Sequence, residues 1–379
     1  MKDVLLLDTN VSSFPIYEYL VSLGYNVWVM GGNPDDCLAK YSTNYIGQDY
    51  SDVLKLKKYI SKYKINYIVP GCNDVSYSAA TQINNKNYLL GLDSYQVDKT
   101  LNNKEIFKNF ALQHNIPVPK VFNVNNLNGY DFPVMVKPSD SFSGRGNTTA
   151  NKQKDIPKAI AKAKKFSKIN GYVIEEYILG QLYSHSAFIS NKKIIQDFIV
   201  EEHCLTNRFV VDTSFVLNNF NDLKYKSIKE NIEKICSLLN LVDGLVHTQF
   251  VDTKDGIKIL EITRRCPGDL YSLLIEKSTG FKYAQNYTNP FIGLPIKPAL
   301  INRSYILRHT ISQSYEKPFI GVDFNKQLNM DFIPLSKTGD IIKESPFSRI
   351  GLVFTKCRSK LEMYEIFKDI LDKKLYNIT

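Results

Sequence analysis

A lysine followed by a loop rich in glycine and serine is the first segment that could bind an anion. Lys137 ends the apolar run 132–136 and precedes the loop 139–146, with the sequence SDSFSGRG. Glycines and small hydroxyl residues let backbone N–H groups close around phosphate oxygens, and a lysine adds a positive charge. The segment predicts a phosphate site, although the P-loop pattern GxxxxGK[ST] is absent, and a plain hairpin turn is the alternative. The candidate phosphate-binding positions are Lys137, Ser139, Ser143, Gly144 and Gly146.

A second lysine lies upstream in a predicted helix over residues 98–114. Lys104 extends the apolar stripe of Phe107 and Ala111. A lysine in such a stripe either meets a buried anion or extends its charged end to solvent, and the pattern alone leaves both open.

Two acids end the predicted strand 172–178. Glu175 and Glu176 are followed by Tyr177, Ile178 and, after one more residue, a glycine. Acids at a strand end followed by an apolar residue and glycine could bracket an adenine and its ribose. An ordinary strand-to-turn junction is the alternative.

Two predicted strands, 245–251 and 257–262, form a hairpin around residues 252–256. Counting back from the turn places Gln249 opposite Ile259, and His247 opposite Glu261. Side-chain alternation then puts seven residues on one face: His247, Gln249, Ile257, Ile259, Glu261, Thr263 and Arg265. A carboxylate, oxygen donors and an arginine suit a magnesium ion bridging phosphates. A solvated face is the alternative, and its two isoleucines argue against it.

Alternating strands and helices must position these residues. Strands at 4–7, 26–30 and 67–70, with helices at 16–23 and 55–63, predict a parallel α/β sheet without a GxGxxG loop. Asn73 and Asp74 follow the third strand, where open sheets bind ligands. Later segments mix helices at 156–167, 228–239 and 361–373 with antiparallel strands. The predicted fold class is therefore α/β followed by α+β.

Composition narrows the functional classes. The chain has 379 residues, enough for two or three domains, and a formal net charge of +10. Its lysines are dispersed, which favours solvated helix faces over a nucleic-acid-binding surface. Six scattered cysteines and the lack of a long apolar run indicate a cytoplasmic protein with reduced thiols and no membrane contact.

In this order the motifs resemble those of the ATP-grasp superfamily over most of the chain. They read NKEIFKNFALQHNIPVP, FPVMVKP, the serine and glycine loop, VIEEYILG, and VHTQFVDTKDGIKILEITRRCPGD. The resemblance implies a Rossmann-like domain at 1–97 and an ATP-grasp domain at 98–300 with a mobile lid near 122–180. A small mixed C-terminal subdomain, 301–379, would complete the core.

The resemblance also assigns roles to residues. Lys104 and Lys137 would contact ATP, together with Glu175, Glu176, Tyr177, Ile178 and the loop. Glu261 would bind Mg²⁺, with Gln249 and Thr263 at the other metal positions and Mn²⁺ as a substitute ion. Arg265 and Asp269 would act with Lys137 on the reacting groups. Gln249 and Thr263 depart from the usual carboxylate and asparagine.

The implied activity is a carboxylate–amine ligase that forms an acyl phosphate and then an amide. Its partners would be a small carboxylate and an amine, with no nucleic acid, and a homodimer is compatible with the resemblance. A bicarbonate-using carboxylase and a non-catalytic nucleotide-binding module are the alternatives. Further candidate contacts, chosen by position, are Asn73, Asp74, His203, Arg208, His247, Arg303 and Arg308.

Overall fold

The computed structural model describes residues 2–84, 89–128, 131–141 and 144–379. A parallel four-stranded sheet of order β3-β2-β1-β4 opens the chain, so the expected α/β lead-in is confirmed. Its strands are β1 (Asp3–Leu7), β2 (Asn26–Met30), β3 (Tyr45–Ile46) and β4 (Tyr67–Pro70). Its helices are α1 (Phe14–Ser22), α2 (Cys37–Tyr41), α3 (Val53–Lys62) and α4 (Asp74–Ile83). Asn73 caps α4 by accepting a hydrogen bond from the Ser76 backbone N–H, which sets Asp74 in the first turn.

Two helices follow where one was predicted over 98–114. They are α5 (Tyr95–Asn102) and α6 (Lys104–Gln113), and the chain breaks between them at Asn103. The Asn103 side chain accepts hydrogen bonds from the backbone N–H groups of Glu105 and Ile106, which is the geometry of a helix N-cap. Lys104 therefore starts a helix instead of extending an apolar stripe. The buried lysine of α6 is Lys108, which is 1% exposed.

A small antiparallel sheet of order β5-β8-β6-β7 comes next and packs against α7. Its elements are β5 (Val121–Phe122), β6 (Val134–Pro138), β7 (Thr148–Ala150), α7 (Ile156–Lys165) and β8 (Tyr172–Glu176).

The largest sheet has eight strands in the order β13-β12-β9-β10-β11-β14-β19-β17. Its first strands are β9 (Gln181–Ser190), β10 (Lys193–His203), β11 (Thr213–Val216), β12 (Gly244–Thr253) and β13 (Gly256–Thr263). Three strands from beyond residue 300 extend it: β14 (Tyr305–Ile311), β17 (Met330–Pro334) and β19 (Gly351–Cys357). The remaining strand pairs are β15 (Lys317–Pro318) with β18 (Ile341–Ile342), and β16 (Val322–Phe324) with β20 (Tyr376–Ile378).

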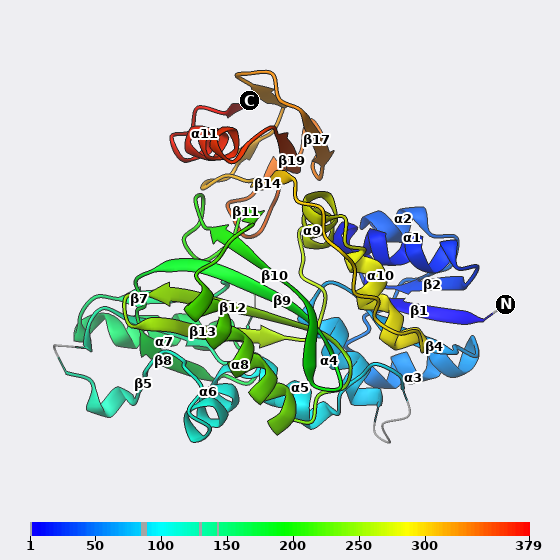
Figure 1. The fold of residues 1–379 in the computed structure, drawn as a ribbon, viewed down its shortest axis with the longest axis horizontal. Helices are drawn as coiled ribbons and strands as arrows, with labels where there is room; N and C mark the ends of the chain where they lie inside the picture. Colours follow the sequence, from blue (N-terminus) through cyan, green and yellow to red (C-terminus); the bar gives the residue numbers. More distant parts are fainter. Residues whose placement is uncertain (1, 85–88, 129–130, 142–143) are drawn as a thin grey trace.

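Helices join the large sheet to its neighbours. They are α8 (Asp222–Leu238), α9 (Tyr271–Thr279), α10 (Tyr283–Thr288) and α11 (Lys360–Leu371). Figure 1 shows α9 and α10 between the large sheet and the N-terminal sheet, with α11 beside the C-terminal strands. One hydrophobic core runs from Leu5 of β1 through Leu274 and Tyr283 to Phe188 of β9. The N-terminal sheet is therefore packed into the same core as the large sheet.

The β12–β13 hairpin has a different register from the predicted one. Thr253 pairs with Gly256, so the turn is shorter than expected, and a β-bulge lies between Gln249 and Phe250. The bulge places Gln249 opposite Glu261 and His247 opposite Thr263. The predicted shared face is wrong for Ile257 and Ile259, which are buried in the core with Phe250.

Candidate active site

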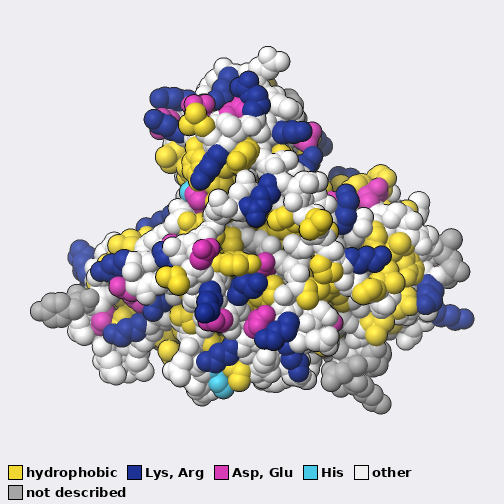
Figure 2. Space-filling model, in the orientation of Figure 1, with side chains coloured by type: hydrophobic (Ala, Val, Ile, Leu, Met, Phe, Trp, Pro, Cys, Tyr) yellow, Lys and Arg dark blue, Asp and Glu magenta, His cyan; other side chains and the backbone are white. Residues whose placement is uncertain are grey.

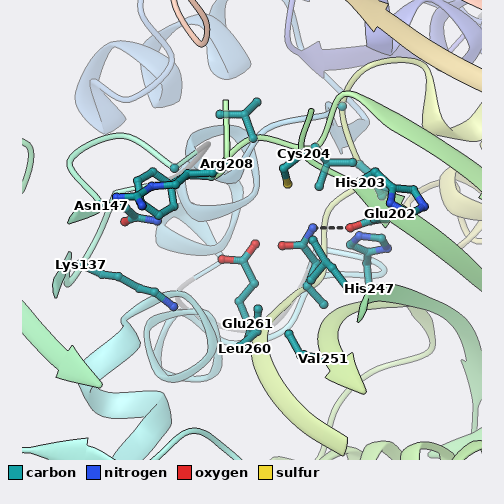
Figure 3. Close-up of a pocket in the computed structure, with 18 of the residues that line it drawn as sticks. Lys137, Asn147, Glu202, His203, Cys204, Arg208, His247, Val251, Leu260 and Glu261 are labelled. Carbon is teal, nitrogen blue, oxygen red and sulfur yellow. Dashed lines mark hydrogen bonds between the residues drawn. The ribbon is translucent and has the colours of Figure 1, made fainter. Parts of the chain in front are cut away.

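A pocket of about 590 Å³ lies where the N-terminal, small and large sheets meet. Lys104 from the start of α6, Lys137 from β6 and Glu261 from β13 all line it. In Figure 3 the Lys137 and Glu261 side chains extend towards the same space. Two lysines and an acid that are far apart in the sequence therefore share one cavity. A volume of this size is ordinary for a small-molecule site.

Lys137 is held by a buried acid on the neighbouring strand. Its Nζ lies 2.6 Å from Oε1 of Glu175, and Nζ of Lys108 lies 3.1 Å from Oε2 of the same carboxylate. Burial alone would raise the pKa of Glu175, but the charges of Lys108 and Lys137 outweigh it and hold this pKa at about 2. Burial lowers the pKa of Lys108 to about 8. Glu175 is buried behind Lys137 and does not line the pocket.

The loop after β6 is anchored from both sides. Lys104 Nζ donates to the backbone carbonyl of Ser141 over 2.6 Å, and both residues line the pocket. Gly144 also lines it, at φ +67°, and a Cβ there would lie 2.4 Å from the Phe209 carbonyl oxygen. Ser139 and Gly146 pack behind the loop, against Gly171 and against Pro138 with Phe166. Ser143 lies outside the described residues.

Apolar side chains form one wall of the pocket. The end of β8 contributes Glu176, and the linker to β9 contributes Tyr177 and Ile178; all three are predicted nucleotide contacts. Other apolar lining residues are Pro119, Met135, Leu182, Val251 and Leu260. A flat heteroaromatic ring could be buried against such a wall, with backbone groups of the linker free to bind its edge.

A polar surface continues across the large sheet. Gln249 and Glu261 are directly paired residues, so their side chains lie on the same face. On the other side of β9, three residues lie opposite one another on neighbouring strands. Glu202 of β10 is opposite Ser214 of β11, and Ser214 is opposite Arg308 of β14. Gln249 Nε2 donates to Oε2 of Glu202 over 2.6 Å and connects the two groups.

Glu202 was not among the residues predicted from the sequence. It is 4% exposed and lines the pocket, and burial raises its pKa. Its strand, β10, ends in two adjacent acids, Glu201 and Glu202, and the local sequence does not distinguish a site residue from a solvated one. Only the pairing of β10 beside β9, one strand away from β12, brings Glu202 to Gln249.

Arg265 is tied to the N-terminal sheet. Its Nε lies 2.9 Å and its Nη2 lies 3.2 Å from the two carboxylate oxygens of Asp74. Thr263 donates its hydroxyl to the same carboxylate over 3.2 Å and does not line the pocket. Burial raises the pKa of Asp74, but the Arg265 charge outweighs this and keeps it below its usual range. Asp74, proposed on position alone, is thus a pocket residue with a defined partner.

Asp269 faces the C-terminal strands. It forms an ion pair with Arg349 and accepts a hydrogen bond from the Thr310 hydroxyl over 3.3 Å. Its backbone carbonyl accepts a hydrogen bond from Nη1 of Arg308 over 3.2 Å. Arg308 is 3% exposed and lines the pocket. In the described parts of the chain its Nε has no hydrogen-bond partner and no carboxylate lies within ion-pair distance.

The other positional candidates divide into two groups. Asn73, His203, Arg208 and His247 line the pocket. His247 bonds through Nδ1 to the Ser186 hydroxyl at 2.9 Å, and burial lowers its pKa to about 3, so it is neutral near pH 7. Arg303 instead donates to the Asn218 carbonyl and is not a lining residue.

The donor set fits a magnesium ion that takes its remaining ligands from phosphates and water. The Glu261 carboxylate has no hydrogen-bond or ion-pair partner among the described residues, and Gln249, which also carries an amide oxygen, is its paired residue on the same sheet face. No group of three or more His, Cys, Asp or Glu that could hold a metal ion occurs in the described part of the chain. Mg²⁺ is commonly bound by one or two carboxylates plus substrate phosphates, so a sparse protein set is compatible with it.

Comparison with known proteins gives the family. Residues 130–272 match the family model of the ATP-grasp domain. The chain therefore contains an ATP-grasp domain over these residues. A curated relative, a formate-dependent phosphoribosylglycinamide formyltransferase from Prochlorococcus marinus, is 27% identical over 186 residues. That match covers 47% of this ATP-grasp chain and 48% of the relative, so the chain spans about half the relative's length.

Solved structures extend the similarity to the whole ATP-grasp chain. An L-amino acid ligase from Bacillus licheniformis superposes with a TM-score of 0.79 at 17% identity, covering 100% of this chain and 98% of the ligase. A biotin carboxylase domain from Hydrogenobacter thermophilus, in complex with MgADP and bicarbonate, gives 0.78 at 12% identity and covers 100% and 90%. At these identities the likeness establishes the fold, which agrees with the predicted class.

On the face drawn in Figure 2, basic side chains do not gather in one patch. Figure 2 shows lysines and arginines dispersed over the visible face and interspersed with acids and apolar side chains. Among the described residues, no helix is both long and apolar enough to cross a membrane.

Proposed function

We propose that this ATP-grasp protein is an ATP- and Mg²⁺-dependent carboxylate–amine ligase that forms an acyl phosphate and then an amide. The carrying observation is that Lys104, Lys137, Glu261 and Arg308 line one pocket although they come from four separate parts of the chain. Three cations and one open carboxylate suit a metal-bound polyphosphate beside a second anion. We also propose the division into 1–97, 98–300 and 301–379, with the small sheet as a lid.

The nucleotide would lie with its adenine against the apolar wall and its phosphates towards Lys104 and Lys137. The linker at Tyr177 and Ile178 would bind the ring edge through backbone groups. Ser141 and Gly144 line the phosphate side of the pocket, where backbone N–H groups can approach oxygens. Glu176 and the neighbouring pocket residues are available to the ribose.

The site residues would promote transfer by positioning and by charge. The metal, held by Glu261 and the Gln249 amide oxygen, would neutralise phosphate oxygens. Lys137 can leave Glu175 and donate to the γ-phosphate, while Lys108 remains paired with the buried acid. The substrate carboxylate would attack the γ-phosphate in line and release ADP, and an amine would then displace phosphate from the acyl carbon.

Arg308 would select a carboxylate substrate. Its guanidinium is almost wholly buried, and no carboxylate of the described residues lies within ion-pair distance of it. The charges of Glu202 and Asp269 act on it from beyond that distance, so an anionic substrate would offset more of the cost of its burial. Arg265 is less available because Asp74 already occupies its Nε and Nη2. Arg265 and Asp74 would instead fix the side of the pocket that receives the reacting group.

The test is a phosphate-release screen with ATP, Mg²⁺ and a matrix of carboxylates and amines. We expect release that requires one member of each class, together with equal amounts of amide and ADP. Release with bicarbonate alone would replace the ligase by a carboxylase. Tight ATP binding without turnover across the matrix would indicate a nucleotide-binding module and contradict the proposal.

A further inference from the structure

We infer that Glu202 is a positioning residue for the metal site, where it orients the Gln249 side chain and supplies the negative charge that a glutamine lacks. The inference rests on the proposed function, because it concerns the metal that Glu261 would hold. It explains how Gln249, an amide opposite Glu261, can serve as a metal ligand where a carboxylate is expected.

In the hydrogen bond between the two side chains, Gln249 is the donor and Glu202 is the acceptor. An ionised carboxylate can only accept hydrogen bonds, so the amide NH₂ group of Gln249 must face Oε2 of Glu202, 2.6 Å away. The amide oxygen is then directed away from Glu202. Since Gln249 is paired with Glu261 on the same sheet face, that oxygen is presented beside the Glu261 carboxylate. In Figure 3 the dashed line ends on the Glu202 carboxylate, and Glu261 lies on the other side of the pocket from Glu202.

Burial makes this orientation rigid. Glu202 is 4% exposed, and its backbone carbonyl accepts a hydrogen bond from Gln181 Nε2 over 2.9 Å. Water therefore has little room to replace Gln249 as a partner. A ligand held by a second residue in this way needs less ordering when the metal binds.

The same contact accounts for the amide at position 249. A glutamate there would place two carboxylates within hydrogen-bond distance in a buried site, and like charges so close do not both ionise. With glutamine, the pair carries one negative charge shared across a short hydrogen bond. The identities at positions 202 and 249 are thus coupled: one acid and one amide.

The experiment measures Mn²⁺ affinity by electron paramagnetic resonance in the presence of a non-hydrolysable ATP analogue. The variants are Glu202→Gln, Gln249→Glu and the double variant that exchanges the two side chains. Glu201→Gln is the matched control, because it removes the same charge from the residue just before Glu202. The Glu201 side chain is hydrogen-bonded to His203 and does not line the pocket. Thermal unfolding and affinity for the analogue in EDTA are recorded for each protein.

We expect Glu202→Gln to weaken Mn²⁺ binding by about tenfold, as is usual for residues that orient a metal ligand. Gln249→Glu should weaken it or leave it unimproved. The double variant should restore Mn²⁺ affinity towards that of the parent. In it the amide at position 202 would donate to the carboxylate at position 249. One oxygen of that carboxylate would then remain for the metal. The control should match the parent.

Unchanged Mn²⁺ affinity in Glu202→Gln, or tighter binding in Gln249→Glu alone, would overturn the inference. An exchange variant that folds and binds the analogue in EDTA but stays as weak as the single variants would also overturn it. A parent protein that binds no nucleotide in any condition would instead refute the proposed function, and the inference with it.

Discussion

Glu175 accepts ion pairs from two lysines at a position that is 1% exposed, and the two lysines differ in what surrounds them. Lys108 is fully enclosed, whereas Lys137 reaches the pocket. Under the proposed function, Lys108 would therefore keep the acid compensated while Lys137 binds a phosphate. A single lysine could not serve both anions.

Replacing Lys108 by methionine tests this division of roles. We expect a loss of about 3 kcal/mol in stability, because an ion pair is broken in a dry site. We also expect lower turnover with ATP, because Lys137 would then be the sole partner of Glu175. Lys137→Met should lower turnover while Lys108 remains paired, so its stability loss should be smaller. Differential scanning fluorimetry and ADP release provide the two measurements, and equal stability losses would contradict the scheme.

The ion pairs of Glu175 also predict how stability depends on pH. The folded pKa, about 2, lies below the value of 4.5 for a free glutamate. The contribution is therefore complete above about pH 4.5 and is lost as the pH falls towards 2, and it amounts to about 3 kcal/mol. Melting temperatures between pH 6 and pH 3 should fall more steeply for the parent than for Glu175→Gln. Glu230→Gln, on the exposed surface of α8, should follow the parent.

Among single residues, the sequence indicated those that lie within recognisable motifs. Lys104, Lys137 and Glu261 were predicted as site residues, and the structure brings them to one pocket. Lys108 and Glu202 were missed because nothing in their local sequence distinguishes a buried ion pair from a solvated charge. Their roles depend on Glu175 and Gln249, partners that lie far away in the sequence.

The loop after β6 is the element on which nucleotide binding should depend most. Gly144 adopts φ +67°, and it lies against the Phe209 carbonyl of the segment after β10. A side chain at this point would both strain the backbone and push the two segments apart.

Gly144→Ala should reduce turnover by roughly tenfold to a hundredfold, because the loop that we propose binds phosphate would be displaced. The matched control is Gly24→Ala at the end of α1, where φ is +78° but no atom lies within 4 Å of the added Cβ. Both variants should lose about 1 kcal/mol of stability from the backbone strain alone. Titration with a fluorescent ATP analogue separates them, and equal affinity for both variants would argue against a docked loop.

Element boundaries were easier to predict than pairings. The strands at 4–7, 26–30 and 67–70 were confirmed because continuous apolar runs mark buried parallel strands. The helix break at Asn103 and the bulge after Gln249 were missed, since a single cap and a single extra residue leave the hydrophobic pattern nearly intact. Both affect the site, because they set Lys104 at a helix start and Gln249 opposite Glu261.

Two ion pairs between distant regions of the chain lie beside the pocket. Asp74 of α4 binds Arg265 after β13, and Asp269 binds Arg349, which lies just before β19. The N-terminal and C-terminal regions therefore each secure one end of the segment 265–269. Sequence patterns cannot predict such contacts, because each partner looks like a surface charge until the sheets are assembled.

A double-mutant cycle on Asp74 and Arg265 measures the first contact. Arg265→Lys cannot reproduce a two-oxygen pairing, and Asp74→Asn removes the charge that Arg265 meets. Each single variant should lower kcat/KM by at least about tenfold. The double variant should be no less active than the less active of the two single variants. The cycle is calculated from initial rates of the parent and the three variants, measured with the substrate that the phosphate-release screen identifies. Strictly additive losses would show that the two residues act independently.

The Asp74–Arg265 pair has a consequence for engineering. Arg265 lines the pocket and depends on a carboxylate from the opening α/β unit. A chimaera that joins another protein's first hundred residues to the rest of this chain would leave that guanidinium unmatched unless the graft carries its own acid at the start of α4. Donors for such recombination can be chosen by that one position before any question of substrate preference arises.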